Sequence, residues 1–380
     1  MHERLSETLT ALERRGRLRT LEPIRGRDFS SNDYLGLASS PELREAVEDA
    51  FQRGVPVGAG ASRLLRGNQD EHARLEAAAA TFFGAESALF FSSGFLANYA
   101  VFSTLPRRAD LVVYDALIHA SVHDGLRSSQ ASAVEVPHND PTAFDDAITR
   151  WRAAGGRGVA WIAVDTLYSM DGDRAPLRDL FEVARRHDAV LVLDEAHATG
   201  LYGEGGRGLA SEAGLNLEGL PGVISVHTCG KALGVMGGLV VGPRVVSDYL
   251  INRGRPFVYA TAPSPLVAAA VCAALEIVKT QPERRAKFHR QVAFAGQALR
   301  ARTCFEPSGS QILPIVLGAD RRARALAAAL SRRGFDVRAI RPPTVPEGTA
   351  RLRLSITLNV NEVEIDALFD ALATEYEALS

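Results

Sequence analysis

The sequence contains few cysteines and no excess of charge of one sign. Its 380 residues include only 3 cysteines, which lie far apart at Cys229, Cys272 and Cys304. Without a C-x-x-C pair we expect neither a zinc ribbon nor a disulfide framework, and a reducing cytoplasm fits this composition. The 43 basic and 45 acidic side chains give a formal net charge of −2. Bulk charge therefore does not attract nucleic acid or an anionic membrane surface.

Long apolar runs and internal repeats are also missing from the sequence. No run of about 18 apolar residues occurs, so we expect no segment that spans a membrane. The first residues lack the apolar core of a secretory signal. Hydrophobic residues make up 46% and charged residues 23%, as in ordinary globular proteins. The length exceeds what one compact core usually holds, and two packed lobes are therefore expected.

From about residue 85 the chain alternates short β-rich runs with helical patterns. Most of these runs are apolar along their whole length, as expected for strands that helices cover on both faces. The pattern predicts an α/β domain with a mainly parallel seven-stranded sheet, in which ligands bind beyond the carboxyl ends of the strands. The seven runs are 88–91, 110–115, 132–137, 159–165, 189–195, 223–228 and 237–242.

After about residue 265 the pattern changes to long helices separated by a few β-rich runs. This change indicates a smaller α+β lobe that ends in a helix. We expect an N-terminal segment, 1–40, that packs with the small domain, then a large ligand-binding domain, 41–275, and a C-terminal small α+β domain, 276–380.

Asp194 ends one apolar run, and His197 follows it in the sequence DEAHATG. A carboxylate at the mouth of a buried strand is costly unless a cation pairs with it. For an isolated D-x-x-H sequence, a carboxylate that caps the next turn is the ordinary interpretation. A metal pair carries little weight, because the sequence offers no third ligand at metal spacing.

Lys231 follows the run 223–228 and precedes a cluster of glycines, Gly234, Gly237 and Gly238. Desolvation near a strand end lowers the pKa of a lysine and makes its amine a usable nucleophile or base. The alternative is a lysine that extends to the surface. The glycines favour the first interpretation, because they leave room for close approach of a ligand to the backbone.

The segment FFSSGFLANYA reads as a strand, a Ser-Ser-Gly turn and a helix start. Such a helix start directs free N–H groups at one point and suits a phosphate, although an ordinary serine N-cap is compatible with the same pattern. His119 also lies just after a predicted strand, where a histidine more often has a purely structural role. Ser169 lies in the loop after the run 159–165.

Together these residues would place a phosphate-binding helix start, the planar ring of a histidine, a carboxylate and a lysine at one edge of a sheet. Pyridoxal phosphate needs this set, since lysine forms an imine with its aldehyde, a carboxylate keeps its ring nitrogen protonated and histidine covers the ring face. The sequence GEGGRG at 203–208 matches a dinucleotide-binding pattern by its letters, but it opens no clear helix.

The chain resembles the α-oxoamine synthases, pyridoxal-phosphate enzymes of the aspartate-aminotransferase fold (fold type I). Within them it is most similar to the 8-amino-7-oxononanoate synthases of biotin biosynthesis. The resemblance covers nearly the whole chain and rests on FSSNDYLGLASSP, GAGASRLLRGNQDEHARLE, SSGFLAN, LYSMDGDRAPL, DEAHATGLYGEGGRG, HTCGKALG and IRPPTVPEGTARLRLS.

This resemblance implies a role for each matching residue. Lys231, His119, Asp194 and His197 would be catalytic, with Lys231 as the imine lysine, Asp194 on the pyridine nitrogen and His119 stacked on the ring. His197 and Ser169 would lie near the phenolic oxygen. The backbone of Gly94 and Phe95, with Thr228, would hold the phosphate, and Thr261 would reach it from the other subunit of a homodimer. Arg353 would bind the amino acid carboxylate, and Arg19, Asn32, His119 and Thr344 would contact substrate. No metal is expected.

The implied reaction is the decarboxylative condensation of L-alanine with a pimeloyl thioester, which gives 8-amino-7-oxononanoate, carbon dioxide and free thiol in the cytoplasm. Either coenzyme A or an acyl carrier protein could carry the pimeloyl group. Arg63, Arg66 and Arg207 could meet that carrier or could simply be solvated. The alternatives are another α-oxoamine synthase such as glycine C-acetyltransferase, an aminotransferase on the same fold, and a scaffold without catalysis.

Overall fold

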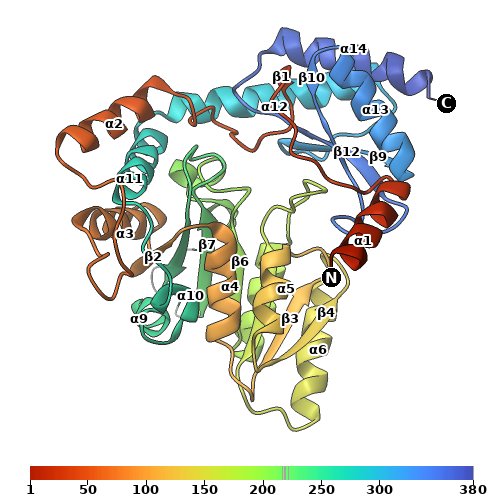
Figure 1. Ribbon diagram of the computed structural model, residues 1–380. Coiled ribbons are helices and arrows are strands. Elements are labelled where there is room, and N and C mark those ends of the chain that lie inside the picture. Colours follow the sequence, from red (N-terminus) through yellow and green to blue (C-terminus); the bar gives the residue numbers. More distant parts are fainter. Residues whose placement is uncertain (216, 218–219, 221, 380) are drawn as a thin grey trace. The chain divides into compact units, whose positions relative to one another are not determined.

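The computed structural model describes residues 1–215, 217, 220 and 222–379. The chain divides into two compact units, each built from segments that are separate in the sequence (Figure 1). The sheet unit comprises Leu35–Tyr168 and Arg174–Arg285. The terminal unit comprises Met1–Tyr34, Ser169–Asp173 and Ala286–Ser380.

A seven-stranded sheet forms the centre of the sheet unit, with strand order β2-β8-β7-β6-β5-β3-β4. Strand β8 runs antiparallel to both of its neighbours, and the remaining pairs are parallel. The predicted α/β fold with a mainly parallel seven-stranded sheet is confirmed. The strands are β2 (Ser87–Phe91), β3 (Leu111–Asp115), β4 (Ser132–Val136), β5 (Ala160–Asp165), β6 (Val190–Asp194), β7 (Val223–Thr228) and β8 (Gly238–Gly242).

Helices cover the strands of the sheet unit and account for the unbroken apolar runs. Helices α4, α5, α9 and α10 share one buried core with alternate residues of the central strands, and α3, α6 and α7 also pack against strands. The helices of this unit are α2 (Pro41–Gln52), α3 (Asp70–Phe83), α4 (Gly94–Thr104), α5 (Ala120–Arg127), α6 (Pro141–Ala153), α7 (Leu177–His187), η1 (Glu204–Gly206), α8 (Leu209–Glu212), α9 (Arg244–Arg253), α10 (Arg255–Val258) and α11 (Pro265–Thr280).

The terminal unit packs helices against small sheets around its own apolar core. A three-stranded antiparallel sheet has the order β11-β12-β9, and β1 pairs with β10 in parallel. Its elements are α1 (His2–Arg14), β1 (Arg27–Asp28), α12 (Pro282–Arg302), β9 (Ile312–Gly318), α13 (Asp320–Arg332), β10 (Phe335–Asp336), β11 (Arg338–Ile340), β12 (Ala350–Ser355) and α14 (Glu362–Glu377). None of the helices in the described part of the chain combines the length and hydropathy needed to cross a bilayer.

Four adjacent strands of the large sheet end in polar residues. Thr228, Asp194, Asp165 and Asp115 are the last residues of β7, β6, β5 and β3. Because these strands are parallel, their carboxyl ends meet at one edge of the sheet, where ligands bind in such folds. Asp165 and Asp194 are direct partners in the register of β5 and β6, so the fold brings two carboxylates together at this edge.

Candidate active site

Lys231 lies in the loop after β7 and contacts His197 from the loop after β6. The two side-chain nitrogens, Nζ of Lys231 and Nε2 of His197, are 2.7 Å apart. His197 is buried, and Lys231 is half-buried. An amine that meets an imidazole at this distance has a partner for proton exchange. The structure thus brings together two of the residues that the sequence predicts to be catalytic.

Asp194 is held by donors on both of its carboxylate oxygens. Its Oδ1 accepts the backbone N–H of Ala196 at 2.9 Å, and its Oδ2 accepts Nδ2 of Asn98 at 2.6 Å. The side chain is buried. Hydrogen bonds to a carboxylate favour its charged form, so Asp194 is suited to stabilise a positive charge at this edge.

His119 is the N-cap of α5, and its imidazole interacts with the charges of this edge. Burial lowers the pKa of the His119 imidazole, the nearby Asp194 carboxylate opposes that shift, and the Lys231 ammonium adds to it. Burial and the neighbouring Asp194 carboxylate raise the pKa of Asp165 well above its usual range. His119 and Asp165 therefore each interact with both Asp194 and Lys231, which places the four side chains in one electrostatic neighbourhood.

The start of α4 provides the candidate phosphate cradle. Ser93 caps the helix by accepting the N–H of Leu96 at 3.1 Å, while helix geometry leaves the first amides, at Gly94 and Phe95, without an intrahelical acceptor. Thr228 lies against Gly94, because a side-chain carbon added at Gly94 would come within 3.2 Å of its Oγ1. The predicted phosphate contacts, Gly94, Phe95 and Thr228, thus lie in one place.

The glycines after Lys231 are needed for a different reason from the one expected from the sequence. A side-chain carbon at Gly238 would lie 2.6 Å from the Ser93 carbonyl oxygen, and one at Gly234 would lie 2.4 Å from the backbone nitrogen of Ala38. These glycines therefore allow the loop to approach its own chain, where we expected room for a ligand. Their effect on the site is indirect, since Gly238 brings the Lys231 loop against the start of α4.

These residues fit a phosphorylated pyridine aldehyde. The start of α4 offers amide donors to a phosphate, Asp194 offers an anion to a ring nitrogen, and Lys231 offers an amine to an aldehyde. All belong to the sheet unit.

Thr261 lies on an exposed loop before α11 that is bonded to the loop at 57–61. The N–H of Ala262 donates to the Ala61 carbonyl at 3.0 Å, and Oγ of Ser264 donates to the Val57 carbonyl at 2.5 Å. The two loops therefore form one surface, which also carries exposed apolar side chains at Val57, Leu64, Leu65 and Tyr259.

Arg63 is neither solvated nor open to a carrier, which were the two alternatives drawn from the sequence. Its guanidinium makes two bonds of 2.9 Å to the carboxylate of Glu76, and its side chain is only 9% exposed. A buried bidentate pair of this kind holds the loop to α3 and leaves little of Arg63 for a carrier.

Arg353 is buried within the terminal unit, where three groups fix its guanidinium. It donates to the Ser169 carbonyl at 2.5 Å, to Oγ of Ser355 at 2.7 Å and to the Tyr34 hydroxyl at 3.2 Å. Tyr34 in turn donates to Oδ1 of Asn32 at 3.0 Å. A guanidinium carries five N–H groups, so two more can donate to a bound carboxylate. Asn32, Ser169 and Arg353, all predicted from the sequence, are thereby connected.

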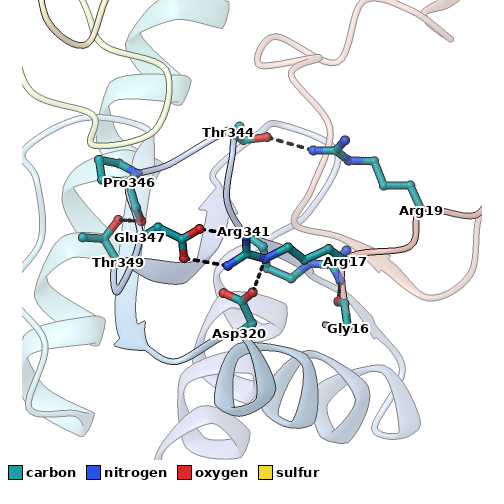
Figure 2. A network of polar contacts seen from close by, with 9 residues as sticks. All are labelled: Gly16, Arg17, Arg19, Asp320, Arg341, Thr344, Pro346, Glu347 and Thr349. Carbon is teal, nitrogen blue, oxygen red and sulfur yellow. Dashed lines mark hydrogen bonds and ion pairs between the residues drawn. The ribbon is translucent and has the colours of Figure 1, made fainter. Parts of the chain in front are cut away.

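Arg19 and Thr344, which the sequence predicts to contact substrate, meet in the terminal unit (Figure 2). Nη2 of Arg19 donates to Oγ1 of Thr344 at 3.2 Å. Beside them Arg17 binds Asp320 and Glu347. Because two carboxylates fix Arg17, they also orient the chain just before Arg19.

Three residues of the site were not assigned a role from the sequence: Asn98, Asp165 and Tyr34. Asn98 stands out as a buried amide in the apolar helix α4. Because buried polar groups are nearly always hydrogen-bonded, a single amide among apolar residues could have indicated that Asn98 has a polar partner. Asp165 ends the apolar run 159–165 as Asp194 ends its own run, so strand direction alone could have placed it at the same edge. Tyr34 carries no comparable pattern.

Glu195 ties the loop that follows Asp194 to the next helix. Its carboxylate accepts the N–H groups of Leu209 and Ala210 at 3.0 and 2.7 Å and the hydroxyl of Thr166 at 2.9 Å. Burial raises the pKa of Glu195 to about 7. The loop beside the candidate site therefore rests on a carboxylate that changes charge near neutrality.

The raised pKa of Glu195 predicts that the free energy of unfolding depends on pH. Between the ordinary carboxyl pKa and about 7 the folded protein retains a proton that the unfolded chain releases, so stability falls as the pH rises through that range, by up to about 3 kcal/mol. In the Glu195→Gln variant this component should vanish. Urea unfolding at about pH 5 and about pH 8 checks it, with Glu212→Gln as a control at an exposed position. Equal pH dependence in wild type and Glu195→Gln would contradict the assignment.

The comparisons with known proteins agree with this geometry. The family model "Aminotransferase class I and II" matches residues 26–372. An 8-amino-7-oxononanoate synthase from Anaeromyxobacter dehalogenans (strain 2CP-1) is 43% identical over 382 residues, covering 96% of this chain and 93% of that protein. Among solved structures, a serine palmitoyltransferase variant from S. paucimobilis with a bound PLP–myriocin aldimine has a TM-score of 0.89 at 26% identity, covering 99% and 97% of the two chains.

A solved 8-amino-7-oxononanoate synthase from Francisella tularensis has a TM-score of 0.77 at 28% identity, covering 93% of this chain and 98% of that chain. The expected fold type I is therefore confirmed. The chain belongs to the class I and II aminotransferase family and, within it, to the 8-amino-7-oxononanoate synthases.

Proposed function

We propose that the protein is a pyridoxal-phosphate enzyme that condenses L-alanine with a pimeloyl thioester, giving 8-amino-7-oxononanoate, carbon dioxide and free thiol in biotin biosynthesis. The choice of substrates rests on the relatives named 8-amino-7-oxononanoate synthase. The observation that carries the chemistry is a set of contacts at one sheet edge. Lys231 meets His197 at 2.7 Å, and Asp194 is connected to His119 through Asn98 and Ser121. A cytoplasmic location is part of the proposal and fits the three free cysteines.

The residues that would hold pyridoxal phosphate lie at or after the carboxyl ends of five strands, β2, β3, β5, β6 and β7. Lys231 would hold its aldehyde carbon, Asp194 its ring nitrogen and His119 its ring face, with His197 and Ser169 near its phenolic oxygen. The backbone of Gly94 and Phe95, with Thr228, would hold its phosphate. When bound, the cofactor supplies an electron sink for charge developed at the α-carbon of an amino acid.

The protein's own groups would then bind, orient and move protons. Arg353, fixed by Ser169, Ser355 and Tyr34, would bind the carboxylate of L-alanine. Lys231 would remove the α-proton as general base, and its contact with His197 offers a place for that proton to go. Asn32, Arg19 and Thr344 would contact the substrates.

We infer that the working form is a homodimer with shared active sites. Exposed apolar groups mark the surface formed by the loops at 57–65 and 259–261, where Leu65 is 77% and Tyr259 is 74% exposed. Exposed apolar patches are typical of protein interfaces. Thr261 lies on this surface, where it would reach the phosphate of the partner subunit's cofactor.

The substrate assignment predicts one product among several. Holoenzyme incubated with L-alanine and pimeloyl-CoA, or with pimeloyl-loaded acyl carrier protein, should release free thiol and give the mass of 8-amino-7-oxononanoate. Lys231→Ala should lose about 1,000-fold or more of this activity and the visible absorbance of the bound cofactor.

Glycine with acetyl-CoA or succinyl-CoA serves as the competing pair, and a 2-oxo acid without thioester tests for transamination. Faster turnover of either alternative, or an active Lys231→Ala variant, contradicts the assignment. Lys279→Ala, at an exposed lysine of α11, is the matched control.

The dimer predicts sensitivity to charge on its surface. Leu65→Glu should shift the protein from dimer to monomer in analytical ultracentrifugation and lower activity, because a buried unpaired carboxylate opposes association. Val245→Glu places the same change at another exposed apolar residue, on α9, and should leave the dimer intact. A monomeric wild type, or a Leu65→Glu dimer of unchanged affinity, is the contrary result.

A further inference from the structure

Asn98 connects two of the candidate catalytic residues through a continuous chain of hydrogen bonds. Its Nδ2 donates to Oδ2 of Asp194 at 2.6 Å and to Oγ of Ser121 at 3.1 Å. Ser121 in turn lies 2.7 Å from Nδ1 of His119. Asn98 and Ser121 are both buried, so water does not compete for these bonds.

The direction of every bond in this chain follows from chemistry. The amide nitrogen of Asn98 lies against both Asp194 and Ser121, and an amide nitrogen only donates, so one of its hydrogens goes to the carboxylate and the other to Oγ of Ser121. Ser121 Oγ accepts that hydrogen and donates its own to Nδ1 of His119. The backbone N–H of Ser121 also donates to Nδ1, at 3.3 Å. Nδ1 is therefore an acceptor, and His119 is neutral with its proton on Nε2.

The neighbouring strand explains why Asp194 needs this donor. Asp165 is the register partner of Asp194 and is also buried at the same edge. Two buried carboxylates side by side do not both ionise easily. The oxygens of Asp194 accept from Asn98 and Ala196, whereas Oδ1 of Asp165 accepts the backbone N–H of His119 at a longer 3.3 Å. The stronger donors favour the charge on Asp194. Other charged groups that act on Asp165 are Lys231 and Asp115.

We propose that Asn98 is a positioning residue, which keeps the negative charge on Asp194 in preference to Asp165 and, through Ser121, keeps His119 neutral. The proposal rests on the proposed function, in which Asp194 faces a ring nitrogen and His119 covers the ring. Asn98 lies one turn beyond Gly94 on α4, about 6 Å along the helix axis. One rigid helix thus serves both the phosphate cradle and the carboxylate.

The test reads the ring nitrogen directly, by solid-state NMR of holoenzyme reconstituted with pyridoxal phosphate labelled with ¹⁵N in the ring. Wild type should show a protonated nitrogen. In Asn98→Leu the signal should move towards the unprotonated position, and kcat should fall about 10- to 100-fold, as for loss of a hydrogen bond to a charged group. KM should change little. Asn98→Ser, which keeps one donor in a smaller side chain, should be intermediate and covers the case in which Asn98→Leu does not fold.

Two further variants separate the parts of the hydrogen-bond chain from Asp194 to His119. Ser121→Ala removes the link to His119 and leaves the Asn98–Asp194 bond, so the ring nitrogen should stay protonated. Tyr99→Phe removes an exposed hydrogen bond from the same helix and should match wild type in both measurements. The proposal is overturned if folded Asn98→Leu or Asn98→Ser retains the wild-type ¹⁵N signal and kcat. Failure of the proposed function would appear differently, as wild-type holoenzyme that does not turn over alanine and the thioester.

Discussion

The adjacent carboxylates of Asp165 and Asp194 are the constraint on which the site depends. Parallel register places them side by side at the ends of β5 and β6, and the interior of the sheet unit makes two negative charges there unfavourable. The protein meets this constraint with donors aimed at Asp194 and with the nearby ammonium of Lys231. A buried anion that is stabilised in this way is prepared for a cationic ring nitrogen.

The parallel sheet also explains how residues from distant parts of the sequence reach one place. Adjacent strands β7, β6, β5 and β3 all end at the same edge, and each following loop contributes a side chain. The loops are held in turn by their own contacts. Gly238 brings the Lys231 loop against the start of α4, and Glu195 fastens the loop after Asp194 to α8. The precision of the site therefore comes from backbone packing behind it.

Local patterns were sufficient to predict the sheet and the main candidate residues. Most strands are compact apolar runs, with the exposed edge strand β4 as the exception. Asp194 ends such a run and His197 and Lys231 follow one, so their position at the sheet edge follows from strand direction alone. Asn98 could not be assigned in this way, because its bond to Asp194 depends on how α4 is rotated against β6. The sequence also did not show why the Lys231 loop contains glycines, since the atoms that leave no room for a side chain there belong to Ala38 and Ser93. Nor does sequence spacing reveal that Ser169 and Arg353 meet.

The central claim is that the amine of Lys231 and the carboxylate of Asp194 contact opposite ends of one pyridoxal phosphate ring. A crystal structure of the protein reconstituted with this cofactor tests it most directly. The account predicts electron density that continues from Nζ of Lys231 into the cofactor, with the ring nitrogen within hydrogen-bond distance of Asp194 and the ring beneath His119. Cofactor density elsewhere, or a ring nitrogen turned away from Asp194, would contradict it.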